Sequence, residues 1–142
     1  MATANHQPLT ALVTGATAGL GKAIAVRLAR DGMQVVVVGR DPARGAAVVE
    51  QIEAAGGQAR FIATDLSDPA DIKHLAQEVG DVDVLVNNAG HSVWAPTEDM
   101  NIADFDAMFA SNVRAPFLLV GAFAPAMAAR GAGCPPPGGR TG

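Results

Sequence analysis

A glycine-rich loop carries the residues of this chain that are best suited to holding a ligand. It spans residues 14–21 with the sequence TGATAGLG, after an apolar run that ends at Val13. At a turn from strand to helix, the first backbone N–H groups of the helix are unpaired and lie at the positive end of its dipole, so they bind phosphate. The glycines permit a tight turn and a close approach of the backbone to a pyrophosphate. Because the spacing is G-x-x-x-G-x-G rather than G-x-G-x-x-G, an ordinary tight turn is the alternative.

Two charged residues follow later apolar runs. Arg40 comes after the run 34–38, where a guanidinium can pair with the 2′-phosphate of NADP and an acidic residue would instead bind the 2′-hydroxyl of NAD. Asp65 comes after the run 59–63, where a carboxylate can accept a hydrogen bond from an adenine amino group. The alternatives are a solvated surface arginine and an aspartate that caps nearby backbone. Arg40 favours NADP over NAD.

The segment Asn87–Gly90, with the sequence NNAG, follows the apolar run 82–86. Its amides can tie neighbouring strand ends together, and its two small residues let a cofactor approach the backbone. A simple turn is the alternative. His91 comes next and could act as an acid or base, and a loop residue without a role in catalysis is the alternative. Trp94 is expected to pack against this loop.

The elements that must position these residues are short apolar runs that alternate with helical patterns. This alternation indicates βαβ units, and hence an α/β fold with a parallel sheet. Asp41-Pro42 and Asp68-Pro69 are each typical of a helix cap followed by the first helical residue. We expect strands at 11–13, 34–38, 59–63 and 82–86, and helices at 19–30, 42–55, 69–79 and 102–129.

Length and composition narrow the function further. The 142 residues suit one domain, and a formal net charge of −4 leaves no basic footprint for nucleic acid. The single cysteine, Cys134, fits a reducing compartment, and residues 1–10 lack the pattern of a signal peptide, so a cytoplasmic location is expected. The apolar stretch 116–129 is too short to span a bilayer and contains a proline, so no membrane partner is expected. No metal site is expected either.

Together these motifs resemble the short-chain dehydrogenase/reductase family. The resemblance covers roughly residues 9–127 and includes the glycine loop, Asp65, the NNAG motif and an Asn112-x-x-x-x-Phe117 pattern. It implies a Rossmann-type, doubly wound parallel sheet, here incomplete, with four strands in the order 3-2-1-4. It also implies hydride transfer between NAD(P) and a small-molecule carbonyl or alcohol. The cofactor-binding residues that it implies are Gly15, Thr17, Gly19, Leu20, Gly21, Arg40, Asp65, Leu66, Asn88, Ala89 and Gly90.

Asn112 is the residue with an expected catalytic role. By the resemblance, its main-chain carbonyl holds a water in a proton relay. Pro116 lies four residues later and has no N–H, so the carbonyl of Asn112 lacks its normal helical partner and is free to bind water. A helix kink without catalytic meaning is the alternative.

The acid of the family, the tyrosine of a Tyr-x-x-x-Lys motif, has no counterpart, since the chain contains no tyrosine. The Pro/Gly-rich residues 131–142 are expected to form a disordered tail after a partial dinucleotide-binding domain over residues 1–130. The abrupt change in composition suggests truncation, for example by a frameshift near 131–134. We therefore expect a cofactor-binding half that is inactive alone. A non-catalytic binding module and a subunit completed by a partner chain are the alternatives.

Two surfaces are expected to associate with other protein. The last helix becomes apolar all round after Pro116, which suits a homo-oligomer. The strand at 82–86 would form an apolar, unprotected sheet edge, which favours pairing with other chains or aggregation.

Overall fold

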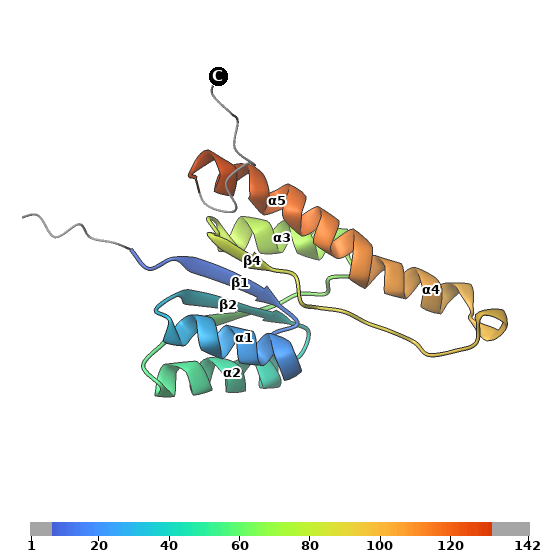
Figure 1. Ribbon diagram of the computed structural model, residues 1–142, viewed down its shortest axis with the longest axis horizontal. Coiled ribbons are helices and arrows are strands. Elements are labelled where there is room, and N and C mark those ends of the chain that lie inside the picture. The colour runs from blue at the N-terminus through green and yellow to red at the C-terminus, as the bar shows by residue number, and fades with distance from the viewer. Residues whose placement is uncertain (1–6, 132–142) are drawn as a thin grey trace, which may run out of the picture.

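The computed structural model describes residues 7–131, which form a parallel sheet with helices on both faces (Figure 1). The four strands lie in the order β3-β2-β1-β4, as predicted. Cys134 and residues 132–142 of the expected tail lie outside the described residues. The strands are β1 (Thr10–Thr14), β2 (Gln34–Gly39), β3 (Gln58–Ala63) and β4 (Val84–Val86), and the helices are α1 (Gly19–Arg30), α2 (Pro42–Ala54), α3 (Pro69–Val79), α4 (Ile102–Phe109) and α5 (Ala115–Ala129).

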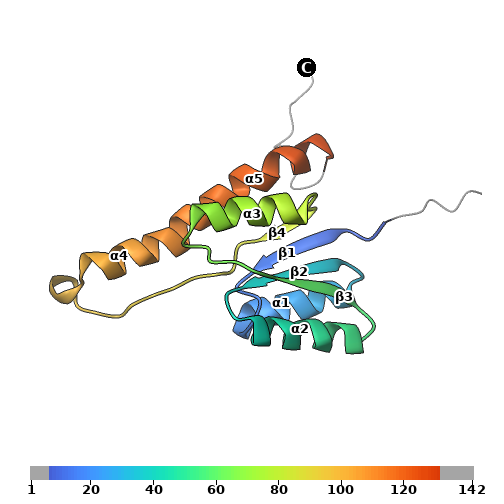
Figure 2. The same ribbon diagram turned by 180° about the vertical axis from the view of Figure 1, so that it is seen from behind.

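The central strands supply side chains alternately to two separate cores. On β2, Val35 and Val37 pack with α1 and α2, whereas Val36 and Val38 pack with α3 and α5. Figures 1 and 2 show these two pairs of helices on opposite faces of the sheet. Cover on both faces explains why β2 is an unbroken apolar run in the sequence. Since all strands are parallel, their carboxyl ends meet at one edge, and the loops that follow them gather there.

Capping residues begin the helices where the sequence predicted. The Asp41 carboxylate accepts a hydrogen bond from the Arg44 N–H at 3.1 Å, and the Asp68 carboxylate accepts one from the Ala70 N–H at 2.8 Å. Each aspartate is followed by a proline at the first helical position, where the missing N–H costs nothing. Asp41 is therefore committed to α2, which leaves the neighbouring Arg40 as the charged group at the end of β2.

The predicted helix over 102–129 is present with the predicted bounds, but its middle is not α-helical. The helix is divided by η2 (Ala110–Arg114), a π-helical turn in which the Ala115 N–H donates to the Ala110 carbonyl. Pro116 lies at the start of α5 and cannot donate to the carbonyl four residues before it. The π-helical turn lies directly before this proline, and turns of this kind are frequent at functional sites.

The apolar segment α4–η2–α5 is only partly covered. Ala115, Leu119 and Phe123 are buried against the sheet and α3, as expected of a core helix of a globular domain. Residues 102–129 nevertheless have the length and composition of a membrane span, which the shorter stretch considered in the sequence did not suggest. Six large apolar side chains of this segment are between 45% and 76% exposed, and they are Ile102, Phe105, Phe109, Val113, Phe117 and Val120.

Candidate functional site

The loops at the carboxyl edge of the sheet surround a cleft of about 420 Å³. Its walls come from the loops after all four strands, together with α4 and η2. Four segments that are distant in the sequence thus meet at one place because the strands are parallel and adjacent. The lining residues are Gly15, Thr17, Gly39, Arg40, Thr64, Asp65, Leu66, Ser67, Asn88, Ala89, Gly90, His91, Ala107 and Ser111.

The structure brings most of the predicted cofactor residues to this cleft. Eight of the eleven line it, and these are Gly15, Thr17, Arg40, Asp65, Leu66, Asn88, Ala89 and Gly90. The other three, Gly19, Leu20 and Gly21, form the first turn of α1. Their roles in binding stay predictions, but their positions agree with a ligand that extends from the first turn of α1 along the ends of the strands.

The first turn of α1 is arranged for an anion. Its cap is Ala18, which makes no side-chain hydrogen bond, and the first turn contains no acidic residue. Gly19 has a φ of +53°, and a Cβ there would meet nothing within 4 Å. A Cβ on Gly21 would collide with the carbonyl of Gly15, so this glycine allows the loop to close on the helix. The first N–H groups of α1 therefore have no capping side chain, and the space beside Gly19 is open.

Thr14 and Asn88 join the loop after β1 to the loop after β4. The Thr14 Oγ1 accepts hydrogen bonds from the N–H groups of Asn88 and Ala89, each at 3.0 Å. The Asn88 side chain donates to the Thr14 carbonyl at 3.1 Å. The predicted tie between neighbouring strand ends is therefore confirmed for Asn88. It holds two walls of the cleft in fixed relation.

Arg40 offers an uncommitted positive charge at the cleft. Its side chain is exposed, and within residues 7–131 its guanidinium has no hydrogen-bond or ion-pair partner. The adjacent Asp41 pairs instead with Arg44, with 3.3 Å between Nε and the carboxylate. The arrangement suits a phosphate ligand, because a guanidinium can bind phosphate through two parallel hydrogen bonds.

Asp65 is held by its own loop. Its Oδ1 accepts hydrogen bonds from the Ser67 Oγ at 2.7 Å and the Ser67 N–H at 2.9 Å. These bonds hold the pKa of Asp65 below its ordinary value, with a smaller lowering from the charge of Arg40, and they outweigh the opposing effect of burial. The capping role left open by the sequence is thus present. Because one oxygen makes both bonds, the other is left for a ligand.

Asn112 fixes the other end of the cleft through its side chain. Its Oδ1 accepts a hydrogen bond from the His91 N–H at 2.8 Å, and its Nδ2 donates to the His91 carbonyl at 2.7 Å. Ser111 Oγ also donates to Asn112 Oδ1, at 2.9 Å. The sequence drew attention to the main-chain carbonyl of Asn112 and missed this side-chain role. The backbone of His91 is therefore fixed, while its imidazole makes no described hydrogen bond and lies at the cleft.

Thr64 is a cleft residue that sequence reasoning missed. Its side chain is 4% exposed, and the hydroxyl has no partner among residues 7–131. Its place directly before Asp65 at the end of β3 was the signal that could have identified it. Gly39, Ser67, Ala107 and Ser111 were missed as well.

The expectation that Trp94 packs against its loop is wrong. The side chain is 98% exposed. The loop is held instead by its backbone, since the Val93 N–H donates to the Met108 Sδ at 3.4 Å. Trp94 therefore takes no part in the described cleft.

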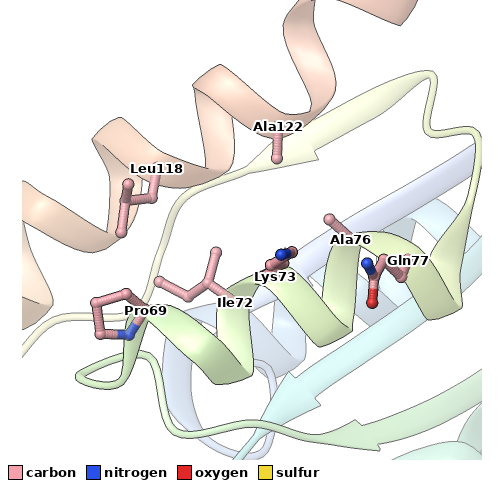
Figure 3. Close-up of a pocket in the computed structure, with 7 residues that line it drawn as sticks. All are labelled: Pro69, Ile72, Lys73, Ala76, Gln77, Leu118 and Ala122. Atoms are coloured by element: carbon pink, nitrogen blue, oxygen red, sulfur yellow. The ribbon is translucent and has the colours of Figure 1, made fainter.

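A second hollow of about 340 Å³ lies between α3 and α5. Figure 3 shows Leu118 and Ala122 of α5 directed toward α3, where Ile72 and Ala76 lie. Lys73 is its only charged residue. This groove shares no lining residue with the cleft and holds none of the predicted site residues.

Comparison with known sequences shows which protein family this chain resembles. The family model described as short chain dehydrogenase matches residues 9–134. A 3beta-hydroxysteroid dehydrogenase of Mediterraneibacter gnavus is 51% identical over 83 residues, which are 56% of this chain and 30% of that protein. An uncharacterized oxidoreductase of Thermotoga maritima is 38% identical over 117 residues, which are 81% of this chain and 47% of that protein. The chain thus spans less than half the length of these relatives.

Solved structures agree with the sequence comparison. A metagenomic short-chain oxidoreductase in complex with NADP has a TM-score of 0.86 and 45% identity, over 88% of this chain and 59% of that one. A short-chain dehydrogenase from Sphingobium yanoikuyae in complex with NADPH has a TM-score of 0.83 and 29% identity, over 88% of this chain and 50% of that one.

Proposed function

The chain belongs to the short chain dehydrogenase family of oxidoreductases, and we propose that it is the part of such an enzyme that binds NADP(H). The observation that carries this proposal is the meeting of eight predicted cofactor residues, from loops after four strands, around one cleft. Two similar structures hold NADP or NADPH. The reaction that we propose for the complete enzyme is hydride transfer between NADPH and a carbonyl or alcohol.

The residues at the cleft and at the first turn of α1 fit the groups of NADP(H). The first turn of α1, with its uncapped N–H groups and open side at Gly19, would hold the pyrophosphate. Arg40 would pair with the 2′-phosphate, and the free oxygen of Asp65 would accept a hydrogen bond from the adenine amino group. Asn88, Ala89 and Gly90 would line the path toward the nicotinamide. When bound, the cofactor supplies the hydride.

Two residues would prepare the reacting end of the cleft. Asn112 holds the backbone of His91 beside Gly90, which shapes the wall against which the nicotinamide would lie. The main-chain carbonyl of Asn112 precedes Pro116 by four residues and would hold a water for proton transfer. The role of the carbonyl is the one predicted from the sequence, and the role of the Asn112 side chain is added to it.

The proton donor is the part that these residues do not provide. The chain contains no tyrosine, so no phenol is available to protonate a substrate oxygen. Hydride transfer to a carbonyl requires such a proton. We therefore propose that these 142 residues bind NADPH without turning over a carbonyl substrate, in a cytoplasmic setting.

A second candidate is a subunit that a partner chain completes. Within residues 7–131, β4 has a neighbour on one side only, and several large apolar side chains of α4 and α5 are exposed. An unpaired edge strand and an uncovered apolar helix face are each suited to pairing with an added strand or helix. The partner would also have to supply the acid.

A titration with NADPH and NADH, followed by a carbonyl-reduction assay, tests these proposals. We expect NADPH to bind more tightly than NADH and the chain alone to show no turnover. Absence of binding to both nucleotides would overturn the main proposal. Turnover by the purified chain would overturn the assignment of a missing acid, and turnover only after a second polypeptide is added would favour the second candidate.

A further inference from the structure

We propose that Arg114 is a positioning residue for the adenosine end of the cleft, an inference that rests on the proposed binding of NADP(H). Arg114 closes the π-helical turn η2, and its Nη2 donates a hydrogen bond to the Ser67 carbonyl at 2.6 Å. The two residues are 47 positions apart in the sequence. Arg114 does not line the cleft itself, so its effect must pass through Ser67.

Ser67 is the residue that shapes the carboxylate of Asp65. Its N–H and its Oγ both donate to the Asp65 Oδ1. On the other side, the Asp65 N–H donates to the Asp71 Oδ2 of α3 at 2.9 Å. The loop after β3 is thus held from α3 and from η2. Removal of the bond from Arg114 frees the peptide that follows Ser67, and with it the pair of donors that orients the carboxylate.

The same turn also holds the opposite end of the cleft. Asn112, two residues before Arg114, fixes the backbone of His91. Side chains two residues apart on a helix point to nearly opposite sides, so one turn can reach two separate loops. The turn η2 therefore links the loop after β3 to the loop after β4. Arg114 therefore holds the loop at the adenosine end of the cleft, and Asn112 holds the loop at the nicotinamide end.

Arg130 provides a matched control within the same chain. Its Nη2 donates to the Val82 carbonyl at 2.7 Å, and its Nη1 donates to Asp81 at 2.8 Å. This arginine lies just beyond α5 and bonds the segment before β4, which contributes nothing to the cleft lining. If arginine–carbonyl bonds served only to hold α5 on the domain, loss of Arg114 and loss of Arg130 would have the same consequences for binding.

The test compares Arg114→Met and Arg130→Met with the wild type, because methionine keeps much of the length and removes the donors. Titrations use NADPH, 2′,5′-ADP as the adenosine half and reduced nicotinamide mononucleotide as the nicotinamide half. We expect Arg114→Met to raise the Kd of 2′,5′-ADP by about fivefold or more, the effect of one hydrogen bond. We expect Arg130→Met to leave that Kd within about twofold, although it removes the same charge.

The remaining measurements decide between positioning and general stability. The Kd of reduced nicotinamide mononucleotide should be the same in Arg114→Met and the wild type. Arg114→Lys, which keeps the charge and one donor, should give a Kd for 2′,5′-ADP between those of the wild type and Arg114→Met. If Arg114→Met does not fold, Arg114→Lys must still bind 2′,5′-ADP more weakly than the wild type does.

The outcomes separate this inference from the proposed function. Wild-type affinity for 2′,5′-ADP in Arg114→Met, or an equal loss in Arg130→Met, overturns the positioning role while NADPH binding by the wild type stands. A wild-type chain that binds neither NADPH nor 2′,5′-ADP overturns the proposed function, and the inference falls with it.

Discussion

The hydroxyl of Thr14 accepts the backbone N–H of Asn88, and the side chain of Asn88 returns a hydrogen bond to the carbonyl of Thr14. This reciprocal pair joins the ends of β1 and β4, the two strands that would flank the middle of a bound dinucleotide. Thr14 is 1% exposed, so these hydrogen bonds are shielded from water. A donor or acceptor left unpaired in such a place lowers the free energy of unfolding. The relative position of two cleft walls therefore depends on Thr14, which does not itself line the cleft.

Replacement of Thr14 by valine tests this dependence. Valine keeps the shape but leaves the N–H groups of Asn88 and Ala89 without an acceptor, and we expect the free energy of unfolding to fall by about 2 kcal/mol. Urea denaturation measures this change. The control is Thr17→Val, which alters a threonine of the same loop that makes no described hydrogen bond. An unchanged stability in Thr14→Val would contradict the role assigned to the reciprocal pair.

The hydrogen bonds from Ser67 predict the titration of Asp65. Because they lower the pKa of Asp65 in the folded chain, this carboxylate contributes stability that is present above its unfolded pKa. That contribution is lost as the pH falls below about 4 and through the folded value. Asp65 is exposed, so solvent screening keeps the effect small.

Side-chain carbon NMR of Asp65 between about pH 2 and 6 measures the titration directly. We expect the pKa to rise in Ser67→Ala, which removes the hydroxyl and keeps the backbone donor. Ser111→Ala is the control, because Ser111 lines the cleft but bonds Asn112 and Met108 instead. Equal pKa values for Asp65 in Ser67→Ala and the wild type would show that the hydroxyl does not set the titration.

The exposed apolar face of α4 and α5 predicts association between copies of the chain. Phe117 is 76% exposed, whereas Phe123 on the same helix is 3% exposed. Phe117→Asp should shift the chain toward the monomer in size-exclusion chromatography with light scattering, with little change in unfolding temperature. Phe123→Asp should instead unfold the domain, because it buries a charge. A wild type that remains monomeric at high concentration would remove the basis for this prediction.

The local parts of the fold were predictable from the sequence, because their causes are local. Asp41 and Asp68 bond residues two or three positions away, and the following prolines mark the helix starts. The carboxyl-edge position of Asp65 and Asn88 followed from the order of strands. These features require only short-range chemistry and the geometry of a parallel sheet.

The missed features depend on contacts between distant residues. Helical periodicity did not reveal the π-helical turn at 110–114, although Pro116 marked a break in the hydrogen bonds of the helix. The bond from Arg114 to Ser67 spans 47 positions, and the bonds from Asn112 to His91 span 21. Trp94 is exposed although indole groups usually pack. Sequence periodicity contains no information on which side chain crosses to which loop.

The most direct test of the central claim alters the cap of α1. Aspartate in place of Ala18 would cap the helix and stabilise it by about 1 kcal/mol, but its carboxylate would occupy the anion site at the first turn. We expect NADPH to bind Ala18→Asp at least about tenfold more weakly than the wild type, with an equal or higher unfolding temperature. Ala18→Ser, a neutral cap, should lose less affinity. Equal NADPH affinity in the wild type and Ala18→Asp would contradict the claim that this turn holds the diphosphate.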